Sequence, residues 1–371
     1  MKVLYWTTLC WPDVGGMEVL AMQTLPALRA QGHEFAVVAS HGIHSLPDVT
    51  EQDGIPIHRF RFREALMAND IKAIFAIQRR IAALKASFAP DLVHFNFSDA
   101  AGYFHLRTQK SHPVPTLFTL HSDFADADSG PRTMFGQCLR DANWISAVSQ
   151  STLDDVLKMV PEQAPYSSVI LNGLKMPVLT PAPLPFEPAH LLCMGRLVPE
   201  KGFDVALHAF AALDARFADV RLSIVGDGPS RPMLEELAAS LGIGERVTFT
   251  GWVQREEVAA LINSATIVVI PSRNREPFAL VALEAAQMGR PVVATRRGGL
   301  QESVADGKSG LLVENENVGA FARAIEFLLE HPERAQAMGQ FGYTRAKDTF
   351  SLERCATAYS ELYQRVGGEE G

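Results

Sequence analysis

The chain has 371 residues, of which 47% are hydrophobic and 20% are charged, so it can bury a sizeable core and intrinsic disorder is excluded. At roughly 150 residues per domain, this length favours two domains. Lysine and arginine number 34 against 42 aspartates and glutamates, for a net charge of -8. This balance argues against a nucleic-acid-binding protein.

The cysteine pattern indicates a reducing compartment. The four cysteines lie far apart and form no C-x-x-C pair, which disfavours a disulfide framework and a structural zinc site. They are Cys10, Cys138, Cys193 and Cys355. No apolar run approaches the ~18 residues that span a bilayer, and Pro12-Asp13 interrupts the first apolar segment before a signal-peptide core develops. We therefore expect a cytoplasmic protein, at most peripheral at the inner membrane face.

The first half of the chain alternates short apolar runs with stretches of helical period. The apolar runs predict strands near 2–6, 34–39, 57–60, 92–95, 115–120, 143–147 and 167–170. The helical patterns lie near 17–31, 70–88, 131–141 and 149–159. This alternation is typical of a parallel sheet covered by helices on both faces.

A proline-rich segment then separates two halves of similar size. Residues 175–188 read KMPVLTPAPLPFEP and contain five prolines, which disfavour both helix and central strand. We predict an interdomain linker over 175–189. It would join an N-terminal domain of residues 1–174 to a C-terminal domain of residues 190–349.

The second half repeats the α/β alternation. Strands are predicted near 190–194, 220–225, 246–250, 266–270 and 291–295, and helices near 203–217, 230–241, 255–262 and 278–288. Three helical patterns without strands follow over 317–366, and we expect the terminal segment 350–371 to pack back on the first domain. Two doubly wound domains imply a ligand cleft at the carboxyl edges of their sheets.

Two glycine-rich turns follow predicted strands. Gly15 and Gly16 come after the first strand and open the first helix, where close backbone approach and free N–H groups suit an anion. A plain turn explains this pair equally well, and the G-x-G-x-x-G fingerprint is absent. Gly226, in the sequence Gly226-Asp227-Gly228-Pro229, could make room for a flat base or a phosphate, although any tight turn between strand and helix looks similar.

Two cations follow the first strand of the second half, in the segment GRLVPEKG over 195–202. Arg196 offers a planar fork that matches phosphate oxygens, and Lys201 adds a mobile charge at the next helix start. A solvated surface is the alternative. The order of strand, glycine and cations favours a diphosphate site.

The most specific pattern is PSRNREPFALVALE over 271–284, in which seven residues separate Glu276 from Glu284. Pro277 suits a helix start, so we expect Glu276 in the preceding loop and Glu284 about two turns into the helix. Two carboxylates could then hold different parts of one extended ligand. Free N–H groups at the helix start could hold an oxyanion between them. These belong to Phe278, Ala279 and Leu280.

Together with Gly298-Gly299, these motifs resemble the family 4 retaining glycosyltransferases, also called glycosyl transferases group 1. The resemblance covers nearly the whole chain and is densest over 190–313. It implies the GT-B fold, which has two Rossmann-like doubly wound domains facing a central cleft and a C-terminal helix that crosses back to the first domain. It also implies metal-independent sugar transfer from a nucleotide-sugar to an acceptor hydroxyl, without a cofactor. Family frequency favours UDP over GDP or ADP.

The resemblance also assigns roles in the second domain. Arg196 and Lys201 would bind the donor diphosphate and stabilise the leaving group. Glu284 would contact the ribose hydroxyls, and Glu276 would contact the donor sugar. The amides over 278–280 would contact sugar and phosphate, although Ala279 stands where the family commonly has glycine.

In the first domain, the resemblance assigns two further positions. Gly16, with Gly15 beside it, would approach the donor phosphates. His121, at the end of the strand near 115–120, matches the family's histidine near the donor sugar. A histidine at a strand end is more often structural, so this role depends on the resemblance.

Two patterns that could bind metal are interpreted as decoys. Asp126-Ala127-Asp128 is a D-x-D signature in a polar loop, and His41-Gly42-Ile43-His44 is not a helical H-E-x-x-H motif. We therefore predict no metal site.

Residues 70–88 carry a basic amphipathic pattern that is also found in membrane-surface helices. Its apolar positions are Ile71, Ile74, Phe75, Ile81, Leu84 and Phe88, and its basic positions are Lys72, Arg79, Arg80 and Lys85. An ordinary core-facing helix with a charged outer face is favoured over a membrane contact.

Other functions stay open at this point. The chain could be a catalytically silent nucleotide-sugar-binding or regulatory protein, since fold does not fix function, or a GT-B epimerase. The complete set of predicted site residues argues against a silent protein. The acceptor, whether saccharide, lipid or small molecule, would contact loops around 40–70 and 97–135, where no specific motif stands out.

Overall fold

The computed structural model describes the chain except for residues 13–14, 43, 97–99, 123–129, 131–132 and 369–371. It divides into two compact units. Unit 1 comprises Met1–Gly173 together with Leu352–Gly371, and unit 2 comprises Leu174–Ser351.

Unit 1 is built on an eight-stranded sheet, counted over its described residues, in the order β3-β4-β2-β1-β5-β6-β7-β8. All neighbouring strands are parallel except β3 and β4, which pair antiparallel. The strands are β1 (Lys2–Trp6), β2 (Glu34–Ser40), β3 (Val49–Gln52), β4 (Ile55–Phe60), β5 (Leu92–Phe95), β6 (Thr116–Leu120), β7 (Trp144–Ala147) and β8 (Ser167–Val169). The helices are α1 (Gly16–Ala30), α2 (Phe62–Met67), α3 (Ile71–Phe88), α4 (Ala100–Thr108), α5 (Met134–Asp141), α6 (Gln150–Met159) and α14 (Leu352–Gly367).

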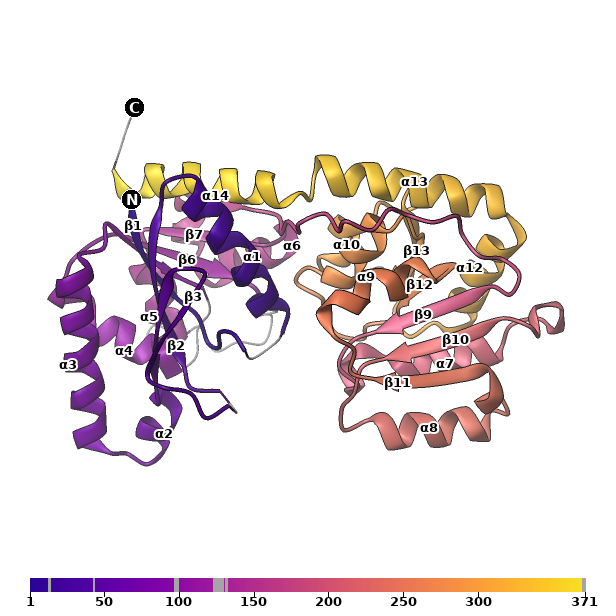
Figure 1. Cartoon of the computed structure of the whole chain (residues 1–371), viewed down its shortest axis with the longest axis horizontal. Helices are drawn as coiled ribbons and strands as arrows, with labels where there is room; N and C mark the ends of the chain where they lie inside the picture. The colour runs from indigo at the N-terminus through magenta and orange to yellow at the C-terminus, as the bar shows by residue number, and fades with distance from the viewer. Residues whose placement is uncertain (13–14, 43, 97–99, 123–129, 131–132, 369–371) are drawn as a thin grey trace. The chain divides into compact units, whose positions relative to one another are not determined.

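The core of unit 1 lies on both faces of this sheet. Leu4 and Trp6 of β1 join a cluster with α3 and α4, whereas Val3 and Tyr5 join a cluster with α1 and α14. Alternate residues of a strand point to opposite faces, so a central strand covered on both sides must be apolar throughout. The C-terminal helix α14 therefore supplies part of the core of unit 1, and it packs against α1 (Figure 1). This confirms the expected return of the terminal helix.

Unit 2 contains, within the described part of the chain, a six-stranded sheet in the order β11-β10-β9-β12-β13-β14, and its paired strands are parallel. The strands are β9 (His190–Met194), β10 (Arg221–Val225), β11 (Val247–Gly251), β12 (Ile267–Ile270), β13 (Val292–Thr295) and β14 (Gly310–Val313). The helices are α7 (Phe203–Ala211), α8 (Arg231–Ser240), α9 (Arg255–Asn263), α10 (Leu280–Gln287), α11 (Leu300–Ser303), α12 (Val318–Glu330) and α13 (Pro332–Asp348).

The proline-rich segment, predicted as a linker, lies within unit 2 and packs against the rest of it. The Arg290 side chain is 1% exposed, and its guanidinium donates to the carbonyl of Ala182 at 2.8 Å. The side chain of Asn263 donates to the carbonyl of Thr180 at 3.1 Å and accepts from the Ala182 amide at 2.9 Å. The backbone groups that proline leaves without secondary-structure partners are thus satisfied by side chains of unit 2.

Helix α3 differs in part from its predicted pattern. Ile81 is buried in the core as expected, but Ile71 and Phe75 are 62% and 58% exposed. Lys85, predicted on the charged outer face, is instead buried, and its ammonium donates to the carbonyl and hydroxyl oxygens of Thr108 at 3.0 and 3.2 Å. The prediction for Lys85 from the helical period was wrong, because a long side chain can reach a polar partner inside the fold. None of the described helices is long and apolar enough to span a bilayer. The preference for an ordinary helix over a membrane contact stays a prediction.

Candidate active site

The carboxyl edge of the unit 2 sheet gathers most of the predicted site residues. Arg196 and Lys201 follow β9, Glu276 follows β12, and β9 and β12 are neighbours in the sheet. Ligands of open α/β sheets bind at this edge because strand-to-helix loops and helix N-termini meet there. The strand order therefore joins two motifs that lie far apart in the sequence.

Lys201 and Glu276 form a direct ion pair. The Lys201 ammonium donates to Oε1 of Glu276 at 2.6 Å, and the hydroxyl of Ser272 donates to the same oxygen at 2.6 Å. The Glu276 side chain is 15% exposed. The pair fixes the carboxylate and leaves Oε2 as its remaining acceptor.

Arg196 is the available cation of this edge. Its side chain is exposed, and none of the described residues accepts a hydrogen bond from it or pairs with its charge. Its backbone is fixed, because the next amide, that of Leu197, donates to the carbonyl of Asp227 at 2.9 Å. An exposed guanidinium that no described carboxylate pairs with, carried on a held backbone, can bind phosphate oxygens.

Arg273, which the sequence analysis missed, ties the two site loops together. Its guanidinium donates to both carboxylate oxygens of Asp204, at 2.7 and 2.5 Å, and to Glu316 at 2.8 Å. It also donates to the carbonyl of Pro199, at the start of the segment that carries Lys201, at 3.0 Å. Burial raises the pKa of Asp204, but the hydrogen bonds and charge of Arg273 outweigh it, so the pKa is lowered.

Glu284, on α10, is 7% exposed and pairs with Arg255, the first residue of α9. Burial raises the pKa of Glu284, and Arg255 opposes that shift only in part. Arg255 was not predicted, since no local pattern indicates a partner on another helix. Trp252, three residues before Arg255, is 69% exposed.

Helix α10 begins at Leu280, two residues later than predicted, because its N-cap Ala279 is extended with φ -73° and ψ 104°. Glu284 therefore lies a little over one turn into the helix. Leu280 provides a free first-turn N–H group, whereas the amides of Phe278 and Ala279 precede the helix. The Phe278 ring is buried against Phe350, with ring centroids 5.6 Å apart.

Gly226 is explained by packing within the sheet edge. Its φ is 124°, and a Cβ there would overlap the carbonyl oxygen of Gly195. Its amide donates to the carbonyl of Gly251 at 2.8 Å. The glycine thus lets the ends of β9, β10 and β11 approach one another, and its contact with a ligand stays a prediction.

Gly299 shapes the Glu276 loop. Its amide donates to the carbonyl of Glu276 at 2.7 Å, and a Cβ at Gly299 would overlap the carbonyl oxygen of Pro277. We expect Gly299→Ala to lower the thermal unfolding midpoint and to reduce activity, because the loop must move by more than an ångström to admit the methyl group. Gly244→Ala is the matched control, since its Cβ would meet nothing closer than 3.8 Å. Equal midpoints and activities for the two variants would contradict this prediction.

In unit 1, Gly15 is the N-cap of α1 and Gly16 is its first residue. The N-cap, being a glycine, has no side chain of its own to cap this helix start. Glu18 is 7% exposed, and its carboxylate lies where a Cβ of Gly15 would be. The glycine thus admits an acidic side chain over the helix start, an arrangement that the sequence did not reveal.

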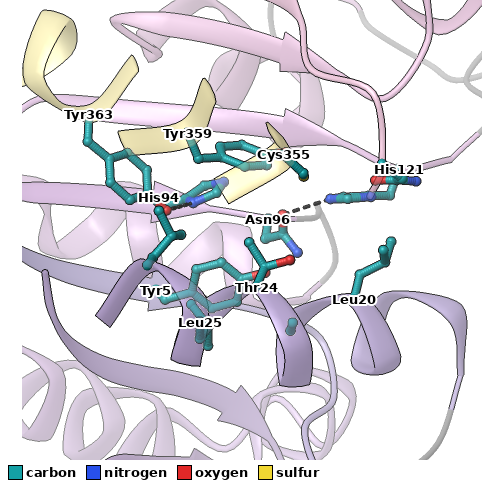
Figure 2. Close-up of a pocket in the computed structure, with 13 residues that line it drawn as sticks. Tyr5, Leu20, Thr24, Leu25, His94, Asn96, His121, Cys355, Tyr359 and Tyr363 are labelled. Carbon is teal, nitrogen blue, oxygen red and sulfur yellow. Dashed lines mark hydrogen bonds between the residues drawn. The ribbon is translucent and has the colours of Figure 1, made fainter. Parts of the chain in front are cut away.

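His121 follows β6 and lies at the edge of a small cavity in unit 1, shown in Figure 2. Its Nε2 hydrogen-bonds to Oδ1 of Asn96 at 2.8 Å. Burial lowers the pKa of His121 to about 4. The imidazole is therefore neutral at pH 7.

Of the two patterns that could bind metal, the structure describes His41 but not the D-x-D signature. Asp126-Ala127-Asp128 lies outside the described residues. His41 pairs with Asp48 at 3.0 Å. The described residues contain no group of three His, Cys, Asp or Glu side chains placed to hold a metal ion.

These two units have the fold of the GT-B glycosyltransferases. The structure is similar to that of sucrose-phosphate synthase from Thermosynechococcus elongatus, with a TM-score of 0.85, 24% identity and full coverage of both chains. It is also similar to HepE from Anabaena in complex with UDP and glucose, with a TM-score of 0.81, 20% identity and coverage of 98% of this chain and 99% of that one.

Sequence comparison identifies the family. Residues 182–345 match the glycosyl transferases group 1 and residues 14–176 match glycosyltransferase family 4. The chain belongs to the family 4 glycosyltransferases, as its motifs predicted.

Three relatives illustrate the range of this family. The chain is 39% identical over 178 residues to a GDP-mannose-dependent alpha-(1-6)-phosphatidylinositol monomannoside mannosyltransferase of Mycolicibacterium smegmatis, covering 46% of this chain and 47% of that one. That match thus spans about half the length of the relative. The chain is 28% identical over 381 residues to glycogen synthase of Mycobacterium tuberculosis, covering 94% of this chain and 91% of that one. It is 32% identical over 279 residues to D-inositol 3-phosphate glycosyltransferase of Corynebacterium efficiens, covering 69% of this chain and 65% of that one.

Proposed function

We propose that this protein is a retaining, metal-independent glycosyltransferase that moves a sugar from a nucleoside-diphosphate sugar, with UDP preferred, to an acceptor hydroxyl. The observation that carries the proposal is Arg196, with which none of the described residues pairs, at the same carboxyl sheet edge of unit 2 as the Lys201–Glu276 pair. Membership of family 4 supports it. The alternatives of a silent binding protein or an epimerase have no observation in their favour.

The proposed reaction is a displacement on one face of the sugar. The bond from the anomeric carbon to the β-phosphate oxygen breaks, and the acceptor oxygen bonds to that carbon from the same face. The departing β-phosphate oxygen takes the acceptor proton. Arg196 and Lys201 stabilise the charge that develops on the diphosphate.

Each carboxylate then has a distinct part in donor binding. Oε1 of Glu276 already accepts from Lys201 and Ser272, so Oε2 is the atom that would accept from a sugar hydroxyl. Glu284 would accept from the ribose hydroxyls while Arg255 balances its buried charge. HepE, whose structure was determined with UDP and glucose, supports UDP as the nucleotide, whereas the M. smegmatis relative makes GDP the competing outcome.

The test is donor turnover without a known acceptor. The enzyme is incubated with UDP-glucose, UDP-N-acetylglucosamine, GDP-mannose and ADP-glucose, with and without EDTA, and nucleotide release is followed. We expect release from a UDP-sugar, unchanged by EDTA, and NMR of the freed or transferred sugar should show the donor's α configuration. An inverted product or loss of turnover in EDTA would contradict the mechanism. Release from GDP-mannose alone would reject the UDP preference but not the transfer.

A further inference from the structure

A buried polar network lies at the carboxyl ends of β5 and β6 in unit 1 (Figure 2). His94 of β5 uses both ring nitrogens, with the Tyr363 hydroxyl at 2.7 Å from Nδ1 and the Thr119 hydroxyl at 2.7 Å from Nε2. Thr119 in turn hydrogen-bonds to Ser146 at 2.5 Å. His94 is therefore fully used inside the fold and has no nitrogen left for a ligand.

His121, on the neighbouring strand end, uses only one of its nitrogens. Its Nε2 lies 2.8 Å from Oδ1 of Asn96. Asn96 is 2% exposed, and its backbone N–H donates to the Trp6 carbonyl at 2.9 Å. A carbonyl oxygen can only accept a hydrogen bond, so Nε2 must carry the proton. Within the described residues, no group hydrogen-bonds to Nδ1 of His121.

The surroundings keep this ring neutral. The titratable groups that line the same cavity are His94, Tyr5, Tyr359, Tyr363 and Cys355, and none of the described lining residues is charged at pH 7. Burial raises the pKa of the tyrosines and the cysteine and lowers that of His94 to about 3. The nearby α1 carboxylate, Glu18, acts on Tyr5 and is not among the groups that shift His121. In a neutral imidazole, the partner of one nitrogen decides which nitrogen is the acceptor.

We propose that Asn96 is a positioning residue, which holds His121 in its neutral Nε2–H tautomer and so presents Nδ1 as a hydrogen-bond acceptor for a substrate hydroxyl. The cavity beside the pair measures about 20 Å³, enough for about one water molecule, so the substrate does not enter it. The substrate part of this inference rests on the proposed function. The tautomer part does not.

The tautomer can be read without any activity assay. Long-range ¹H–¹⁵N correlation spectra of histidine-labelled protein at pH 7 distinguish the two tautomers, and the His121 signals are those lost in His121→Gln. We expect the wild type to show His121 with the proton on Nε2. Asn96→Leu removes the acceptor and should give a mixture of tautomers. A wild-type ring protonated on Nδ1, or an unchanged tautomer in Asn96→Leu, would overturn the proposal.

Activity tests the substrate part separately. In the donor turnover assay, we expect Asn96→Leu to lower kcat about tenfold with little change in KM, as for the loss of one hydrogen bond. In Asn96→Asp, a carboxylate accepts the same hydrogen bond but stabilises the imidazolium, so the pKa of His121 and the acid limb of kcat against pH should both move up. Thr24→Val, in the same cavity, is the matched control and should change neither tautomer nor kcat.

Different outcomes test the tautomer of His121 and its contact with substrate. A changed tautomer in Asn96→Leu with wild-type kcat, together with full turnover by His121→Gln, would overturn the use of Nδ1 by substrate while leaving donor transfer intact. Absence of turnover in the wild type would instead reject the proposed function. The spectra would still decide whether Asn96 sets the tautomer.

Discussion

Arg196→Ala is expected to lower kcat/KM for donor turnover by about 10²–10³-fold, the usual effect of removing one group that stabilises charge in the transition state. Arg196 is exposed and none of the described residues pairs with it, so its removal breaks no ion pair of the fold. The thermal unfolding midpoint should therefore stay near that of the wild type. Steady-state kinetics and a melting curve on the same preparation check both expectations.

The matched control is Arg221→Ala. Arg221 is also an exposed arginine of unit 2, but it begins β10 and so lies at the opposite, amino edge of the sheet. Its loss should leave kcat/KM within about twofold of the wild-type value. Surface substitutions of this kind usually change the free energy of unfolding by less than about 0.5 kcal/mol. Equal activity in both variants would show that Arg196 has no part in catalysis.

Glu284→Gln is expected to weaken binding of the nucleoside diphosphate by about 10–100-fold, because a hydrogen bond to a charged group contributes about 1.5–3 kcal/mol. The Glu284 carboxylate is buried and already balanced by Arg255, so a neutral amide leaves that arginine unpaired and offers a weaker acceptor to ribose. Isothermal titration calorimetry with UDP measures the change. Glu256→Gln, an exposed residue of α9, is the control.

Protonation of the same carboxylate should weaken nucleotide binding at low pH. Burial raises the pKa of Glu284, so on lowering the pH this group takes up its proton earlier than an ordinary glutamate. Since the protonated form is the weaker acceptor, affinity should fall at a higher pH than for an exposed carboxylate. In Glu284→Gln this part of the pH dependence should disappear. Wild-type affinity in the variant would mean that Glu284 serves only as the partner of Arg255.

Most of the fold follows from the sequence because buried parallel strands must be apolar on both faces. The apolar runs at β9, HLLCM, and β12, IVVI, were therefore predicted within a residue or two. Strand β3 was missed because VTEQ is a polar, half-exposed edge strand with no apolar run. Helix α7 ends at Ala211, earlier than predicted. The prediction ran too far because the apolar pattern continues through a short 3-10 turn at Ala215–Phe217.

The site was predictable where a motif carries its own chemistry and not where two distant segments meet. Arg196, Lys201 and Glu276 follow strands, so their common edge could be expected. The pairing of Arg273 with Asp204 joins residues 69 positions apart, and that of Asn96 with His121 joins residues 25 positions apart. No periodicity marks such partners, because they depend on the order of strands in the sheet.

The most direct test of the proposed function is a thermal-shift titration of the wild type with UDP, GDP and ADP, each with and without EDTA, and of Arg196→Ala. A nucleotide at one hundred times its Kd should stabilise the protein by about 2.7 kcal/mol, which shifts the midpoint of a domain this size by several degrees. We expect a shift with UDP that EDTA does not change and that Arg196→Ala loses. No shift with any nucleotide, or a shift that EDTA abolishes, would contradict it.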